Sequence, residues 1–289
     1  MSALDYTLIG HVCIDELDDG TDRLGGTVHF AAGQALALGC EVRVITSATA
    51  RLAQRLFDAH DGAIELDLRE SDGDTCFGFD PTADDGPARL LSAAAPIDAG
   101  AVAMLLAAAD RGTVHLGPIA GELGPGVVEM ARAGSDYLGI TPQGMLRAFA
   151  EDGSFVVDPS GWHDAVLSAD ALVLNDGEYR RVDQLGLLAG FDGLVFRTLG
   201  RDGALVMRGG TVLAQYASAL GGHLEGANDR PRPVNPDRTI GAGDVFAAAA
   251  FIAHAAGESP ADALEVAVEL ASHWVHRDSE TPCWFGIDS

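Results

Sequence analysis

Short apolar runs alternate along this chain with segments in which apolar residues recur every three to four positions. A run of consecutive apolar residues predicts a strand buried on both faces, and the wider spacing predicts an amphipathic helix. Their regular alternation predicts an α/β fold, a mainly parallel sheet with helices on both faces. The expected strands cover residues 6–10, 40–46, 113–116, 137–140, 171–175 and 193–198, and the expected helices cover 28–39, 50–59, 101–109, 124–131, 244–256 and 260–274, with another beginning at 176.

Shorter, alternating strands interrupt this pattern in the first third of the chain. They cover residues 63–68, 75–79 and 88–93, with turns rich in acids, glycine and proline between them. Inserts of this kind often cover a site as a lid. We therefore expect a single domain over 1–289, with a small β-lid formed from about 12–24 and 64–95. A hairpin over 204–207 and 211–215 and a loop over 220–235 are expected near the C-terminal end.

One glycine-rich stretch, Thr239-Ile240-Gly241-Ala242-Gly243-Asp244, stands directly before the apolar, alanine-rich run 245–256. Small residues leave the backbone N–H groups open, and a helix beginning here adds the positive end of its dipole. Together they predict an anion-binding site. A carboxylate repels an anion, so Asp244 suits the role of acceptor for the proton of an attacking hydroxyl. The alternative is that Asp244 only caps the helix and the glycines only form a turn.

Composition narrows the chemistry, because all 18 basic side chains are arginine and the chain contains no lysine. A P-loop lysine, a protein-kinase lysine and a Schiff-base lysine are therefore excluded. The net charge of −25 makes nucleic acid and anionic membrane surfaces poor partners. No G-x-G-x-x-G follows the first expected strand, which argues against a dinucleotide enzyme.

The four cysteines, Cys13, Cys40, Cys76 and Cys283, are scattered and form no C-x-x-C pair. This spacing argues against a disulfide framework or a zinc site and favours a reducing cytoplasm. The first residues carry no basic segment of the kind that opens a signal peptide. No apolar run reaches the roughly 18 residues that a membrane span needs.

Four motifs in order give the chain a resemblance to the ribokinase-like PfkB carbohydrate kinases, over essentially its whole length. The stretch 239–246 resembles the family signature Asp-Thr-x-Gly-Ala-Gly-Asp, and Gly25-Gly26 before a helix resembles the N-terminal double glycine. The other two motifs are Asn175-x-x-Glu178 and Thr198-Leu199-Gly200-x-x-Gly203. The turn Gln143-Gly144-x-x-Arg147 is similar to one found in some members, and local features resemble myo-inositol kinases.

The resemblance implies an ATP- and Mg²⁺-dependent kinase, and it implies roles for particular residues. Asp244 would be the catalytic base, and the backbone of Gly241, Ala242 and Gly243 would form the anion hole. Asn175 and Glu178 would organise Mg²⁺ and the ATP phosphates, with Glu178 as the metal residue acting through water. Thr198, Gly200 and Gly203 would line the nucleotide site, and Asp15, Gly25, Gly26, Phe30 and Gln143 would bind the substrate.

Two departures from the family pattern bear on specificity. Phe30 replaces an Asn that hydrogen-bonds sugar hydroxyls in many members, which favours a substrate with an apolar or ring face, such as a cyclitol or nucleoside. The alternative is that Phe30 simply packs in the core. Arg238 replaces the Asp that helps to hold a monovalent cation, so we expect activity to depend little on K⁺, although Asp237 could serve from a shifted loop.

The expected function is therefore ATP-dependent phosphorylation of a hydroxyl on a small sugar or cyclitol, with inositol as one candidate. A nucleoside kinase on the same fold and a non-catalytic ligand-binding or regulatory protein are the alternatives. Lid strands pair between subunits in some members, so a homodimer through the lid is a further expectation.

Overall fold

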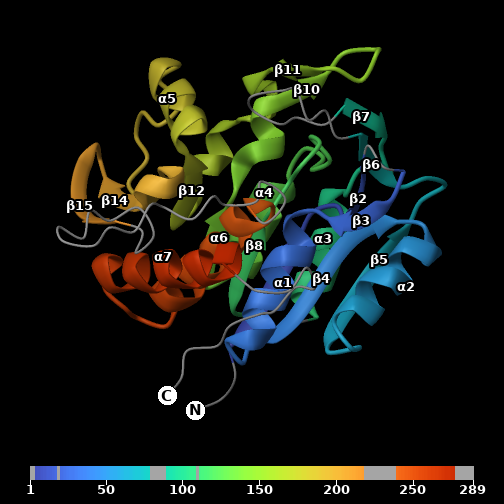
Figure 1. Ribbon diagram of the computed structural model, residues 1–289, viewed down its shortest axis with the longest axis horizontal. Helices are drawn as coiled ribbons and strands as arrows, with labels where there is room; N and C mark the ends of the chain where they lie inside the picture. The colour runs from blue at the N-terminus through green and yellow to red at the C-terminus, as the bar shows by residue number, and fades with distance from the viewer. Residues whose placement is uncertain (1–3, 18–19, 79–88, 109–110, 218–238, 277–289) are drawn as a thin grey trace, which may run out of the picture.

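A nine-stranded sheet runs through the centre of the protein, whose computed structural model describes residues 4–17, 20–78, 89–108, 111–217 and 239–276 (Figure 1). Neighbouring strands pair in parallel, except that β14 is antiparallel to both of its neighbours. In spatial order the strands are β15 (Thr211–Tyr216), β14 (Ala204–Arg208), β13 (Leu194–Thr198), β12 (Ala171–Asn175), β9 (Tyr137–Ile140), β8 (Thr113–Leu116), β1 (Asp5–Ile9), β4 (Glu41–Ala48) and β5 (Ile64–Glu70).

The apolar runs form these strands because both faces of the sheet are covered. Successive side chains of a strand point to opposite faces. Leu8 and Val173 belong to one hydrophobic cluster, whereas their neighbours Ile9 and Leu174 belong to the other. A strand that feeds two cores needs apolar residues at consecutive positions, as the sequence pattern has them.

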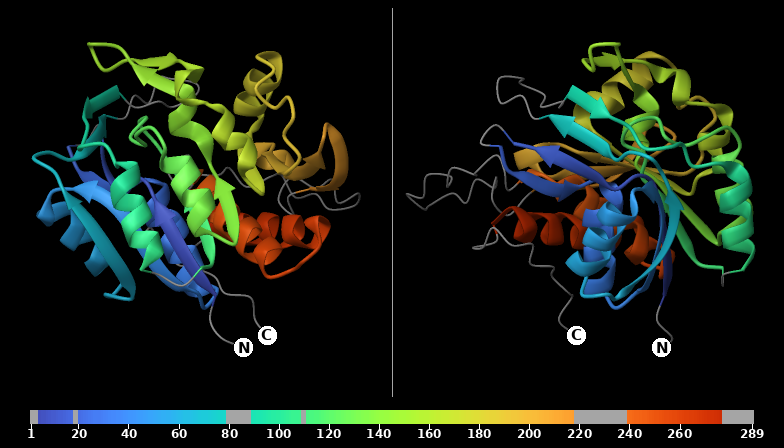
Figure 2. Two further views of the ribbon diagram at one scale, coloured as in Figure 1. Left: turned by 180° about the vertical axis from the view of Figure 1, so that it is seen from behind. Right: turned by 90° about the vertical axis from the view of Figure 1, so that its right-hand side faces the viewer.

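Helices cover both faces of the sheet (Figure 2). Those of one face share a core with Leu8 and Val173, and those of the other share a core with Ile9 and Leu174. The first group is α1 (Thr27–Ala37), α2 (Ala50–Ala59), α6 (Ala242–Ala255) and α7 (Pro260–His276), and the second is α3 (Ala99–Ala107), α4 (Val127–Gly134) and α5 (Asp176–Gln184). The predicted α/β fold class is thereby confirmed.

Helix α6 is buried along most of its length, with every residue from Val245 to Ala253 buried. Its alanines let it approach the sheet and α1 closely. Phe251 packs on the backbone of Gly139 in β9, where a Cβ atom would lie 2.4 Å from the phenyl ring. A helix buried on all sides has little freedom to shift, so its N-terminus is held firmly in place.

A four-stranded small sheet lies beyond the carboxyl ends of the central strands (Figure 1). The predicted β-lid segment 64–95 begins too early, because 64–70 form β5, which pairs with β4 over seven residues of the central sheet. The small sheet consists of β3 (Asp22–Gly25), β2 (Cys13–Glu16), β6 (Thr75–Gly78) and β7 (Arg89–Ser92), in that spatial order.

A hairpin that the sequence pattern did not indicate faces the small sheet. It consists of β10 (Arg147–Phe149) and β11 (Phe155–Val157). The Leu90 amide of the small sheet donates to the Gly153 carbonyl at 3.0 Å, and the Phe77 and Phe149 rings lie 5.9 Å apart. The short 3₁₀ helices are η1 (Pro142–Leu146), η2 (Pro159–Gly161), η3 (Asp164–Ser168) and η4 (Gly200–Asp202).

Helix ends differ slightly from the expected ones. Helix α6 begins at Ala242 rather than at 244, and α4 begins at Val127 rather than at 124. The hairpin of β14 and β15 is confirmed and forms one edge of the central sheet. The loop expected over 220–235, Asp237 and Arg238 lie outside the described residues.

We predict that Gly139→Ala destabilises the protein, because its new Cβ would overlap the Phe251 ring in a closely packed layer. Such overpacking costs about 1–3 kcal/mol of the free energy of unfolding. Gly73→Ala is the matched control, since no atom lies within 4 Å of the Cβ position there. Urea unfolding of both variants tests this, and equal stabilities would contradict the packing described for α6.

Candidate active site

A cavity of about 390 Å³ opens between the carboxyl ends of the central strands and the small sheet. Most of the residues singled out from the sequence line it, although they come from distant parts of the chain. These are Asp15, Gly26, Phe30, Gln143, Asn175, Glu178, Thr198, Gly241, Gly243 and Asp244. The fold thus brings these ten residues to one cavity.

Gly241 is the N-cap of α6 and has a φ of 79°. Only glycine adopts this conformation easily, and a Cβ here would also lie 2.4 Å from the Phe30 ring. No side chain of a described residue caps this helix end, so N–H groups of its first turn remain available to a ligand. The helix dipole points its positive end into the same space. This is the geometry of an anion-binding site.

Asp244 is the third residue of α6, and so it is not the N-cap that the alternative interpretation required. Burial raises its pKa to about 6, opposed by a hydrogen bond from the Thr27 hydroxyl. Glu178 raises the pKa further, whereas Arg147 lowers it. A carboxylate with such a pKa is ionised near neutral pH and is still basic enough to accept a proton.

Phe30 supports the N-terminus of α6 more than it faces the cavity. Its side chain is 7% exposed, and its ring packs on Gly241 and edge-on against Trp274, with centroids 5.8 Å apart. The Trp274 indole donates to the Ile240 carbonyl at 2.8 Å. The two aromatic rings thus fix the backbone that leads into Gly241, and part of Phe30 still lines the cavity wall.

Asn175 and Glu178 form a capping box at the start of α5. The Asn175 side chain accepts from the Glu178 amide at 2.8 Å, and the Glu178 carboxylate accepts from the Asn175 amide at 2.9 Å. Burial raises the pKa of Glu178, while this amide, Arg147 and a hydrogen bond from Gln143 oppose the shift. Gln143 therefore lies against Glu178 as well as lining the cavity.

The described residues contain no cluster of three or more His, Cys, Asp or Glu side chains that could hold a metal. Glu178 offers a single carboxylate, already shared with a backbone amide. Mg²⁺ commonly binds through one or two carboxylates plus water and substrate phosphates. The residues present fit that manner of binding, with Glu178 as the protein's contribution.

Arg147 is a cation of this site that the sequence analysis did not assign. It begins β10, lines the cavity, and is close enough to Asp244 and Glu178 to influence the pKa of both carboxyls. Burial lowers its own pKa, and the two carboxylates oppose that shift. Its guanidinium lies 5.4 Å from the centre of the Phe155 ring. The absence of lysine was the available signal, because a phosphate site then needs an arginine.

Glu122 is a second residue that the sequence analysis missed. Its buried carboxylate accepts the backbone amides of His11, Ile119 and Ala120 at 2.9, 3.0 and 2.8 Å. It thereby joins the loop after β1 to the loop after β8, and Ile119 of the second loop lines the cavity. A single Glu in a glycine-rich stretch gives no sequence signal for this role.

The small sheet contributes the remaining polar wall of the cavity. Asp15 and Arg23 face each other across β2 and β3, with Arg23 Nε 3.2 Å from Asp15 Oδ2. Position 25 must be a glycine, because a Cβ atom there would lie 2.9 Å from the same Asp15 oxygen. Gly26 is the N-cap of α1 with a φ of 92°.

The expected nucleotide turn lies partly outside the cavity. Thr198 at the end of β13 lines it, whereas Gly200 and Gly203 do not. These two glycines have φ values of 62° and 94° and shape the turn around η4, where the Leu199 amide donates to the Gly203 carbonyl at 2.8 Å. The turn is present, but among the described residues only Thr198 connects it to the cavity.

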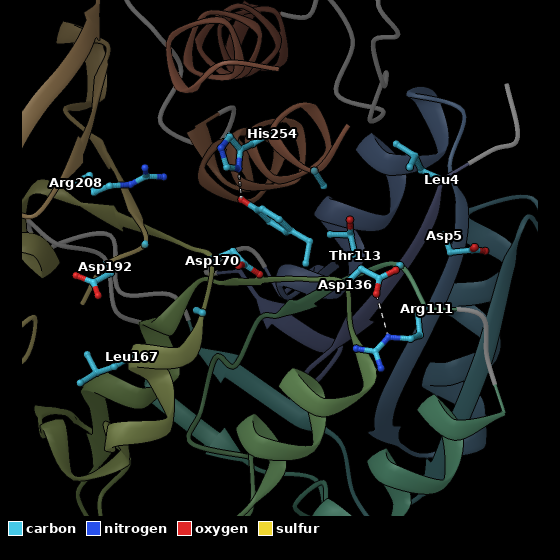
Figure 3. Close-up of a pocket in the computed structure, with 15 residues that line it drawn as sticks. Leu4, Asp5, Arg111, Thr113, Asp136, Leu167, Asp170, Asp192, Arg208 and His254 are labelled. Atoms are coloured by element: carbon cyan, nitrogen blue, oxygen red, sulfur yellow. Dashed lines mark hydrogen bonds and ion pairs between the residues drawn. The ribbon is translucent and has the colours of Figure 1, made fainter. Parts of the chain in front are cut away.

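A second cavity of about 670 Å³ lies at the other end of the central strands, where these strands begin (Figure 3). It contains none of the residues singled out from the sequence. Arg111 pairs with Asp136 at 3.0 Å, and His254 at the end of α6 lies 3.2 Å from the Tyr137 hydroxyl. The cavity with Asp244 is smaller, yet it contains the anion-binding geometry.

No protein-family model matches this sequence, and a search of the curated proteins found no match either. Solved structures do match. One is a pyrophosphate-dependent kinase in the ribokinase family, complexed with a pyrophosphate analog and myo-inositol; it is 20% identical, with a TM-score of 0.76 over 96% of this chain and 97% of that one.

Two others have a TM-score of 0.66 at 15% identity, over 96% of this chain and 95% of theirs. They are a ribokinase from Thermotoga maritima and an uncharacterized sugar kinase from Pyrococcus horikoshii in complex with ATP. The identities are low, so the likeness concerns the fold, which is that of the ribokinase-like PfkB kinases.

Proposed function

We propose that this protein is a kinase that transfers a phosphoryl group to a hydroxyl of a small polyhydroxyl compound. The observation that carries the proposal is the start of α6, where Asp244, with a pKa of about 6, stands in the first turn of a helix whose N-terminal amides face the same cavity. An anion site with an adjacent base is what phosphoryl transfer from a donor to a hydroxyl requires.

In this mechanism Asp244 accepts the hydroxyl proton as the oxygen attacks the phosphorus, and the bond from that phosphorus to the bridging oxygen of the donor breaks, so that the donor leaves one phosphate shorter. The amides at Gly241, Ala242 and Gly243 stabilise the negative charge on the phosphoryl oxygens. Arg147 supplies the positive charge that a lysine provides in other phosphate sites. The small sheet, held to the β10–β11 hairpin by the Leu90–Gly153 hydrogen bond, limits the entry of water and so acts as the lid.

ATP is the proposed donor, with Thr198, Gly200 and Gly203 beside the nucleotide and Asn175 and Glu178 toward its phosphates. Bound Mg²⁺ would supply charge neutralisation on the donor phosphates, held in part by Glu178. Pyrophosphate is the alternative donor. It is favoured by the position of Gly200 and Gly203 outside the cavity, which leaves fewer described residues to contact a base.

For the acceptor we propose a neutral sugar or cyclitol, inositol included, with Asp15, Gly25 and Gly26 at its hydroxyls. Phe30, Phe77 and Phe149 line the same cavity and suit a ring with an apolar face. A nucleoside kinase shares this requirement and stays as the alternative acceptor class. A non-catalytic binding protein is disfavoured, because binding alone gives no use for a partly buried base beside an anion site.

Two further properties are part of the proposal. Cys13, Cys40 and Cys76 are free thiols, which suits a reducing cytoplasm. Within the described part of the chain, no helix has the length and apolar character of a membrane span.

Leu91 on β7 is 51% exposed, which favours pairing of two small sheets in a homodimer.

The proposal is tested by incubating the purified protein with Mg²⁺ and either ATP or pyrophosphate. The acceptors are sugars, inositols and nucleosides, and phosphorylated products are detected by ³¹P NMR. We expect one acceptor class to yield a phosphate monoester. Acceptor binding without product, for every donor, would replace the kinase by a binding protein.

We predict that Asp244→Asn lowers kcat by about 10²–10⁴-fold, because the amide cannot accept a proton. Acceptor binding and thermal stability should be retained, since the substitution keeps the size of the side chain and removes a charge from a partly buried position. Asp136→Asn, which alters the far cavity, is the matched control. Normal turnover in Asp244→Asn would refute the assignment of the base.

We also predict a pH dependence of kcat/KM. Asp244 works only when ionised, so the value should be constant above pH 7 and fall about tenfold per pH unit below its pKa of about 6. The residual kcat/KM of Asp244→Asn should not show this fall on the acid side of the pH profile. An unchanged acid limb in that variant would assign the titration to another group.

Finally, we predict that Arg147→Gln lowers kcat by about 10²–10³-fold, because the transferring phosphoryl group loses its nearest cation. Arg147→Lys should restore part of the loss, since the charge returns without the planar guanidinium. Arg111→Gln serves as control, and rate measurements at saturating acceptor and donor separate the effect from binding. Equal kcat in Arg147→Gln and the unaltered protein would exclude this role.

A further inference from the structure

We infer that Arg23 determines acceptor specificity and that, together with Asp15, it selects a neutral cyclic polyol with neighbouring hydroxyls. The inference rests on the proposed kinase function and adds to it a substrate class and a residue. Both side chains line the cavity from the small sheet, and their backbones are a register pair of the β2–β3 ladder. The ladder therefore holds a hydrogen-bond donor, Arg23, and a hydrogen-bond acceptor, Asp15, side by side.

The hydrogen bonds of the pair leave groups free on each side. Arg23 contacts Asp15 through Nε, and among the described residues its two Nη groups make no hydrogen bond. Among the described residues, the one hydrogen-bond donor to Asp15 Oδ1 is the Cys13 thiol at 3.7 Å, a weak donor. A hydroxyl group both donates and accepts, so one hydroxyl donates to Asp15 while its ring neighbour accepts from Arg23.

Charge indicates that the acceptor is neutral. Of the described residues that line the cavity, three are acidic, Asp15, Glu178 and Asp244, and two are basic, Arg23 and Arg147. Arg147 lies toward Glu178 and Asp244, where the transferred phosphoryl group is bound, and Arg23 is paired with Asp15. No described cation is left over for a phosphate or carboxylate on the acceptor itself, and the surplus acid would repel one.

Apolar groups beside the ion pair indicate a ring, since Phe77 on β6 is the register partner of Asp15 on β2. Phe77 and Ile119 belong to one buried cluster with Phe149 packed against it, and all three line the cavity. A ring sugar or cyclitol has one face of C–H groups and an edge of hydroxyls. The C–H face would pack on these side chains while the edge meets Asp15 and Arg23.

The first test uses calorimetric binding, which needs no turnover. The probes are myo-inositol, glucose and fructose 6-phosphate, titrated into the full-length protein. We expect a neutral probe to bind at least tenfold more tightly than fructose 6-phosphate. Preferred binding of fructose 6-phosphate would overturn the inference while leaving the kinase function intact.

The second test uses Arg23→Gln, with the neutral probe that binds and its monodeoxy analogues. We expect its KM and Kd to rise about 10- to 100-fold with kcat changed less than about threefold, the loss expected for one hydrogen bond to a charged group. The unaltered protein should bind one of the monodeoxy analogues much more weakly than the neutral probe. In Arg23→Gln this difference in affinity should disappear. Arg23→Lys should recover part of the affinity.

Arg55→Gln is the matched control, because Arg55 pairs at 2.5 Å with Asp22, the residue before Arg23 in β3, and neither Arg55 nor Asp22 lines the cavity. It should leave KM, Kd and discrimination unchanged. Unchanged KM and discrimination in Arg23→Gln would refute the inference. Loss of binding in Arg23→Gln in a protein that turns over no acceptor would uphold the inference on binding and refute the kinase proposal.

Discussion

Burial of α6 is the constraint on which the site depends. Nine consecutive buried residues, 245–253, hold this helix between the sheet and α1, so its N-terminus has one position available. Gly241 begins the helix with a positive φ under the Phe30 ring, and Trp274 fixes the preceding carbonyl. The packing of the core thus orients the amides of the first turn and the Asp244 carboxylate before a ligand binds. Binding then requires no reorganisation of these groups.

The absence of lysine makes the site depend on backbone donors and on two arginines. Arg147 lies with Glu178 and Asp244, and Arg23 lies with Asp15, so each cation has acidic partners within one cavity. In a chain of net charge −25, these two guanidinium groups would reduce the repulsion between the carboxylates and the phosphate donor of the proposed kinase. Arginine suits this task because it stays protonated even where burial lowers its pKa.

The sequence indicated the parts of this structure that local patterns encode. Consecutive apolar residues predicted the central strands, and Gly241 to Asp244 predicted an anion site at a helix start. It did not indicate that 64–70 pair with β4, since alternating residues look alike in an edge strand and in a small sheet. The environment of Arg147 and the amides bound by Glu122 depend on loops far apart in the chain, and pairings of that kind leave no local pattern.

The assignment of Asp244 as the base requires direct transfer from donor to acceptor, and the stereochemical course of the reaction tests this requirement. The donor would be ATP made chiral at the γ-phosphorus with oxygen isotopes, and the configuration of the phosphorylated acceptor would be read by ³¹P NMR. If Asp244 accepts the proton of the attacking hydroxyl, the group moves once, directly, and its configuration is inverted. Retention would require two displacements through a phosphorylated side chain, and it would contradict the assignment of Asp244 as the base.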